Sequence, residues 1–156
     1  MGSLYQYFPS KDSLLGELLV RHHKAAEPVL DRALTRLADP STPLESGLRQ
    51  LLEDLVAMHQ ANPALTRALS TAVISHSTVA EALHKEDDHH QQHVIAVLAR
   101  RPDVRAGDHL AMALVLEQAT GQLRRWLVHD APPVVKPGVL LEEIVQLLTR
   151  FLRADG

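Results

Sequence analysis

The chain has 156 residues, 46% hydrophobic, 22% charged and 3% aromatic, which supports a single soluble domain with a buried core and excludes a disordered or fibrous chain. Its 27 leucines and 19 alanines against seven glycines favour helices over strands, so we expect an all-α helical bundle. A formal net charge of −3 is too acidic for a self-sufficient nucleic-acid binder, and the lack of cysteine excludes disulfides, thiolate metal sites and a catalytic thiol.

Capping residues and apolar periodicity predict the first two helices. Ser10 is a favourable N-cap for a helix whose apolar stripe runs to residue 37, with a kink expected at Pro28. A second helix is predicted to start with Thr42 as N-cap, Pro43 as first residue and Glu45 as third. The hydroxyl and the carboxylate would then each satisfy a free backbone amide of that first turn.

Similar signals continue along the chain. Asn62 followed by Pro63 predicts the start of a shorter helix. The remaining periodic segments predict helices over about 78–101, 108–128 and 139–152. Pro102 ends the first of these, and a proline-rich loop precedes the last. The last helix is apolar on more than one side, which indicates that it is covered on more than one side.

The first residues concentrate aromatic side chains that the rest of the chain almost lacks. On a helix, Tyr5 and Tyr7 would lie exposed near Lys11, which is typical of a surface that contacts phosphate. The same aromatics would also fit a small cluster that caps the core. The residues alone leave both interpretations open.

The run GSLYQYFPSKDSLL, residues 2–15, resembles the end of the helix-turn-helix in tetracycline-repressor-type (TetR-family) transcriptional regulators. The resemblance implies that residues 1–9 are a remnant of the DNA-binding domain, in its recognition helix. Ser3 would then lie near base edges, Tyr5 and Tyr7 near the DNA backbone, and Lys11 at a phosphate. Residues 10–156 would form the effector-binding and dimerisation domain.

The resemblance also implies a function. The parent protein would be a cytoplasmic, homodimeric repressor that a small-molecule effector releases from its operator DNA. Because the family places two more helices before this run, we expect an N-terminally truncated regulator that binds operator DNA weakly by itself. The alternative is a free-standing helical protein that binds a small molecule or a metal ion.

Polar side chains embedded in apolar helices are the candidates for an effector pocket, which we expect to be largely apolar. Each of them also fits an ordinary core or surface position. The predicted lining residues are Leu55, Met58, His59, Leu69, Val73, His76, Val94, Gln118 and Gln122. We predict no cofactor.

A homodimer interface is predicted on the last two helices, where small residues allow close approach and the final helix is apolar on several sides. The predicted interface residues are Ala119, Gly121, Leu123, Ile144, Leu148 and Phe151.

The sequence does not favour a metal site or a catalytic site. His89 and His93, with His84 nearby, have the spacing of paired metal ligands on a helix, but a solvated helix face explains them as well, so no metal site is predicted. No arrangement of serine, histidine and carboxylate has the setting of a catalytic site, and we expect no enzyme. The longest apolar run, residues 110–116, is too short to span a membrane.

Overall fold

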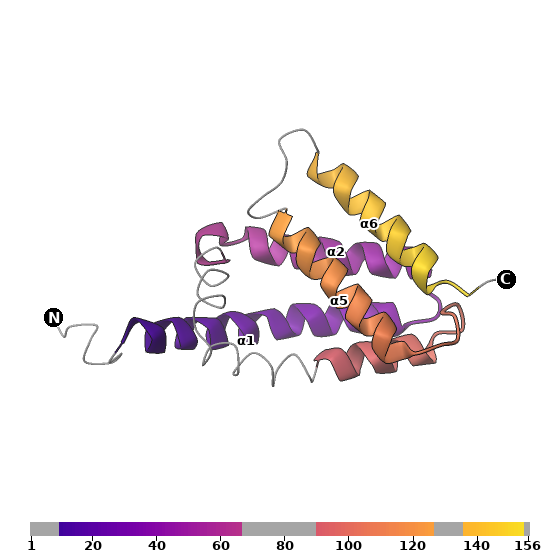
Figure 1. Ribbon diagram of the computed structural model, residues 1–156, viewed down its shortest axis with the longest axis horizontal. Helices are drawn as coiled ribbons and strands as arrows, with labels where there is room; N and C mark the ends of the chain where they lie inside the picture. Colours follow the sequence, from indigo (N-terminus) through magenta and orange to yellow (C-terminus); the bar gives the residue numbers. More distant parts are fainter. Residues whose placement is uncertain (1–9, 67–89, 127–135, 155–156) are drawn as a thin grey trace.

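Helices account for most of the residues that the computed structural model describes, which are 10–66, 90–126 and 136–154 (Figure 1). The helices whose two ends lie within these ranges are α1 (Lys11–Ala38), α2 (Leu44–Gln60), α5 (His109–Arg125) and α6 (Pro137–Leu152). Residues 63–66 and 90–100 are helical as well. Within the described ranges the β-type pairing is limited to an isolated bridge between Val104 and Arg153. The predicted all-α fold is confirmed.

Helix α1 begins where its capping residues predict. The Ser10 hydroxyl accepts a hydrogen bond from the Ser13 amide at 3.1 Å, and the Ser13 hydroxyl accepts one from the Ser10 amide at 3.2 Å. This reciprocal pair satisfies two amides that the first turn leaves without helical partners. The helix then continues through Pro28 to Ala38.

The predicted start of α2 is wrong by one residue. Pro43 is the N-cap, the helix begins at Leu44, and no side chain caps it. Thr42 instead belongs to the turn after α1, where its amide donates to the carbonyl of Asp39 at 3.1 Å. Its own carbonyl accepts a hydrogen bond from Arg101 at 2.8 Å. Long-range contacts of the turn therefore override the local capping signal.

The other helix starts follow from sequence. The Asn62 side chain accepts from the Leu65 amide at 3.1 Å, so it caps the helical residues 63–66 as predicted. The Asp108 carboxylate caps α5 by accepting from the amides of Leu110 and Ala111 at 3.0 and 3.1 Å. Helix α6 starts at Pro137, two residues before the predicted start at about 139, because the fixed φ of proline suits the first helical position.

Helices α1 and α2 run antiparallel and side by side, and α5 and α6 pack at an angle against α2 and against each other (Figure 1). Gly47 of α2 faces α1 so closely that an added Cβ would lie 2.9 Å from the Cδ1 atom of Leu37. The two helices therefore approach tightly near their connecting turn. The buried core beside them consists mainly of leucines, including Leu34, Leu37, Leu48, Leu51, Leu52, Leu98, Leu123, Leu148 and Leu152.

The turn between α1 and α2 is held by a buried arginine that follows the helical residues 90–100. The Arg101 side chain is fully buried, and its guanidinium donates to the carbonyls of Leu37 at 2.5 Å, Asp39 at 3.1 Å and Thr42 at 2.8 Å. It also forms a two-pronged pair with the Asp103 carboxylate at 2.7 and 2.8 Å. The hydrogen bonds from Arg101 hold the pKa of Asp103 below its usual value. One side chain thus satisfies carbonyls at the end of α1 that have no helical partner.

Helix α6 is tied to α2 by a second ion pair. Arg49 of α2 donates two hydrogen bonds to the Glu142 carboxylate of α6, one of them at 3.0 Å, and also contacts Glu45 at 3.3 Å. Glu45 therefore faces Arg49, rather than the backbone amide predicted for it. The hydrogen bond from Arg49, followed by one from Gln146, lowers the pKa of Glu142 to about 2.

We expect the Glu142 ion pair to stabilise the fold in a pH-dependent way. The folded-state pKa of about 2 lies below the ordinary value of 4.5, so its contribution is complete above pH 4.5 and is lost as pH falls toward 2. Glu142→Gln should therefore lower the Tm at neutral pH, and the difference from the natural chain should shrink in acid. Thermal unfolding followed by circular dichroism checks this, with the exposed Glu143→Gln as the matched control. A difference in Tm that stays constant with pH would contradict the assignment.

Candidate functional site

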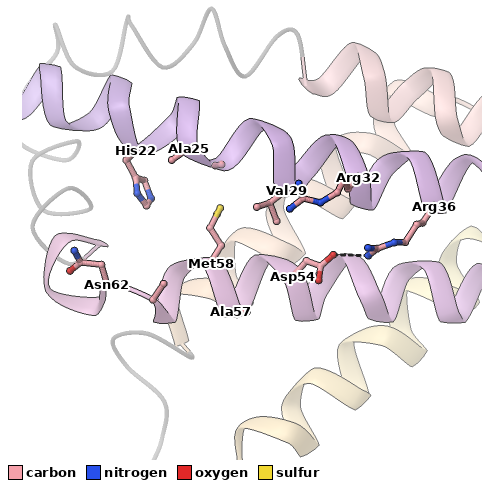
Figure 2. Close-up of a pocket in the computed structure, with 11 residues that line it drawn as sticks. His22, Ala25, Val29, Arg32, Arg36, Asp54, Ala57, Met58 and Asn62 are labelled. Carbon is pink, nitrogen blue, oxygen red and sulfur yellow. Dashed lines mark hydrogen bonds and ion pairs between the residues drawn. The ribbon is translucent and has the colours of Figure 1, made fainter.

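A pocket of about 440 Å³ lies between α1 and α2. Its size falls in the range of small-molecule sites. Figure 2 shows His22 and Asn62 toward one end, Arg32, Arg36 and Asp54 toward the other, and Met58 between them. The lining consists of His22, Ala25, Ala26, Val29, Arg32 and Arg36 of α1, and Asp54, Ala57, Met58, Ala61 and Asn62 of α2 and the turn after it.

Small side chains explain why the pocket lies at the end of the α1–α2 pair that is away from the connecting turn. Ala25 and Ala26 of α1 and Ala57 and Ala61 in and after α2 all line it. Near the connecting turn, by contrast, leucines fill the space between the same helices and belong to the buried core. Side chains as short as alanine leave space between two helices that the larger residues would fill. The walls are therefore mostly apolar, with polar groups concentrated at the two ends.

The charged end contains two arginines and one carboxylate among the described residues. Arg36 donates to Asp54 at 3.0 Å, and this pair is drawn as a dashed line in Figure 2. Asp54 also accepts a hydrogen bond from the Gln50 amide at 3.0 Å. Arg32 lines the same end and makes no hydrogen bond or ion pair with any residue of the described ranges. Within the described part of the chain, this end therefore carries one uncompensated positive charge.

The other end is bordered by His22, which contacts a second, buried histidine. The His22 ring lines the pocket and meets the ring of His59 edge-on, with centroids 5.7 Å apart and planes at 79°. His59 is buried, with 3% exposure, and its Nδ1 atom lies 2.7 Å from the Leu55 carbonyl oxygen. Because a carbonyl oxygen only accepts hydrogen bonds, Nδ1 carries the proton of this contact. His59 thus packs against the His22 ring and is not among the residues that line the pocket.

The structure places only some of the residues predicted for an effector site at the pocket. Met58 lines the pocket, whereas Leu55 and Val94 are partly buried against the core. Gln118 and Gln122 are exposed on α5 and are not among the lining residues. Leu69, Val73 and His76 lie outside the described residues. The predicted set thus contributes one residue to the pocket that the structure shows.

The lining residues that the sequence did not predict lie mainly on α1, where the periodicity of the apolar stripe predicts core packing only. A sequence signal for them exists in retrospect. Ala26 of that stripe and the adjacent Ala25 are smaller than the leucines before and after them, and Arg32 and Arg36 follow one turn apart. Small residues followed by two stacked charges are unusual on a helix face that only fills a core.

Most of the predicted DNA-contacting residues lie outside the residues that the structure describes. Ser3, Tyr5 and Tyr7 precede the described ranges, and Lys11 is the first residue of α1. Their predicted roles therefore stay predictions.

The predicted dimer residues fall into two groups. Leu123 and Leu148 are each 1% exposed and belong to the core of this chain, so their side chains are not available to a partner. Ala119, Ile144 and Phe151 are partly buried against that core. Gly121 has open space beside it, because an added Cβ would meet nothing within 4 Å.

Exposed apolar side chains nevertheless gather on these helices. Every large hydrophobic residue that is exposed in the described ranges belongs to α5, its C-cap or α6. These residues are Leu110, Leu114, Val115, Trp126, Val139 and Leu147. An accumulation of this kind is typical of a surface that another protein covers.

The histidine-rich segment is described only in part. His84 and His89 lie outside the described residues. The Nδ1 atom of His93 lies 3.9 Å from the Oδ1 atom of Asp31. Among the described residues, no group of three side chains is placed to hold a metal ion.

None of the described helices combines the length and the apolar character needed to cross a bilayer.

Comparisons with known proteins agree with this architecture. No curated protein and no solved structure matches the chain. Residues 43–152, however, match a family described as "Tetracyclin repressor-like, C-terminal domain". Domains of this family are regulatory rather than catalytic, and they generally dimerise and bind effectors. Since the match covers most of a helical chain with a pocket and an exposed apolar face, the chain belongs to the tetracycline-repressor-like C-terminal domain family.

Proposed function

We propose that this chain supplies the effector-binding and dimerisation part of a ligand-responsive transcriptional regulator, a cytoplasmic repressor that releases its operator when a small molecule binds. Residues 10–156 would form this part, and residues 1–9 would belong to the DNA-binding domain. One observation carries the proposal: a wall of the pocket is α1, the helix whose first turn lies within the helix-turn-helix-like run, residues 2–15.

The geometry of α1 suits coupling between an effector and DNA. The pocket residues of α1 run from His22 to Arg36, while its capped start at Ser10 adjoins the proposed DNA-contacting residues. Near the connecting turn, α1 is held to α2 by the close contact at Gly47. The pocket lies at the other end of this helix pair, so a ligand inserted there would change the angle of α1 about the Gly47 contact. A ligand that binds one angle better shifts the population toward it.

We further propose that two copies pair through α5 and α6. The exposed leucines and valines of these helices would pack in a symmetric interface of four helices. Gly121 would allow the closest approach, since the space beside it is open in one chain. The interface thus keeps the predicted helices, but its main contacts are Leu110, Leu114, Val115, Val139 and Leu147, in place of Leu123 and Leu148.

Filling the pocket tests the effector site. Ala57 lines the pocket and is exposed within it, so Ala57→Trp should occupy the site without opening the core. We expect members of a panel of small acids, bases and neutral apolar compounds to raise the Tm of the natural chain and to have no effect on this variant. Ala99→Trp, at an exposed position of residues 90–100, is the control and should respond like the natural chain. Equal responses in both variants would contradict the site.

A further inference from the structure

We infer that the pocket selects a small apolar molecule that carries one acidic group, with its carboxylate held by Arg32. This inference rests on the proposed function, because it takes the pocket between α1 and α2 as the effector site. It goes further by assigning the chemical class of the effector.

Among the residues that the structure describes, the charges that line the pocket do not balance. These lining residues contribute the guanidinium groups of Arg32 and Arg36 and a single carboxylate, that of Asp54. Asp54 is engaged by Arg36 at 3.0 Å. Arg32 has no hydrogen-bond or ion-pair partner among the described residues. One positive charge at the pocket is therefore available to a ligand.

The sequence of α1 offers Arg32 no acidic neighbour on its own face. The positions three and four residues away are Pro28, Val29, Thr35 and Arg36. The nearest charged group on that face is thus another guanidinium, and like charges four residues apart on a helix repel each other. A carboxylate bound at Arg32 would remove this repulsion and form a charge-assisted, two-pronged hydrogen bond.

The remaining lining favours an elongated apolar body. Ala25, Ala26 and Val29 of α1 face Ala57 and Met58 of α2 across the pocket. Arg32 and His22 are ten residues apart on one helix, which corresponds to about 15 Å along its axis. A molecule anchored at Arg32 would extend its apolar part along the alanines toward His22, as the arrangement in Figure 2 allows.

Calorimetric titration of the whole chain at neutral pH tests the assignment, with decanoate, decan-1-ol and decylamine as probes. We expect decanoate to bind most tightly of the three. Arg32→Gln should weaken decanoate binding about tenfold, the effect of losing one partly exposed charge-assisted hydrogen bond. Arg100→Gln removes the same charge from an exposed position outside the pocket, and it should change the Kd less than twofold.

A second variant is expected to act in the opposite direction. Asp54→Asn removes the carboxylate that engages Arg36 and so frees this guanidinium. Decanoate should then bind more tightly, a gain that damage to the fold would not produce. Weaker binding by Asp54→Asn, equal Kd values for Arg32→Gln and Arg100→Gln, or no decanoate binding would each overturn the inference. Decan-1-ol that binds as tightly as decanoate, and loses binding in Ala57→Trp, would overturn the acidic class and leave the proposed function intact.

Discussion

Replacing Arg101 with methionine should lower the free energy of unfolding by about 3 kcal/mol or more. Methionine fills a similar volume but cannot donate hydrogen bonds. The carbonyls of Leu37, Asp39 and Thr42 would lose their guanidinium donor, and Asp103 would lose its cation. Because these groups meet where α1 ends and α2 begins, the loss should also loosen the contact that we propose as the fixed point for the movement of α1.

Urea denaturation followed by circular dichroism measures this effect. Arg100→Met is the matched control, since Arg100 is the preceding residue and is exposed. Exposed substitutions of this kind change stability by about 0.5 kcal/mol or less. Equal midpoints for the two variants would show that the hydrogen bonds of Arg101 do not hold the turn.

Leu147→Glu should convert a dimer into monomers. Leu147 is 62% exposed in a single chain, the largest value among the exposed large hydrophobic residues of the described ranges. In the proposed symmetric interface each substitution occurs twice, so two apolar contacts would be lost and two carboxylates would be buried. We expect the dimer Kd to rise by about 100-fold or more.

Sedimentation equilibrium measures the change in dimer Kd. Ala99→Glu, at an exposed position outside α5 and α6, is the control and should leave the Kd unchanged. Unaltered circular dichroism of Leu147→Glu would separate loss of the interface from loss of the fold. A variant that stays dimeric would place the interface on another surface.

Much of the fold follows from local signals. Ser10, Asn62 and Asp108 cap helices as their residue types predict, because their side chains satisfy amides only a few positions away. Thr42 shows where local reasoning fails. Its carbonyl accepts a hydrogen bond from Arg101, which is 59 residues away in sequence. The residues around Thr42 give no sign of this long-range contact.

The candidate sites were harder to predict, for a related reason. Periodicity shows that α6 has two apolar sides, but it does not show which side faces its own chain. Leu148 proves to be buried, while the adjacent Leu147 is exposed. The pocket likewise depends on which helices pair. Ala25 and Ala57 create space only because α1 and α2 lie side by side, and Gln118 lies on another helix.

The central claim is that a ligand between α1 and α2 moves α1 within a dimer, and a distance between two copies of α1 tests it most directly. The chain has no cysteine, so a spin label attached to Lys24→Cys, an exposed position of α1 outside the pocket, would report only this helix. Pulsed electron resonance would measure the distance between the two labels before and after saturation with whichever panel compound raises the Tm. We expect a defined distance that shifts on saturation when the pocket is unaltered and does not shift in Ala57→Trp. A lack of coupling between labels, or a distance unchanged by a saturating ligand, would contradict it.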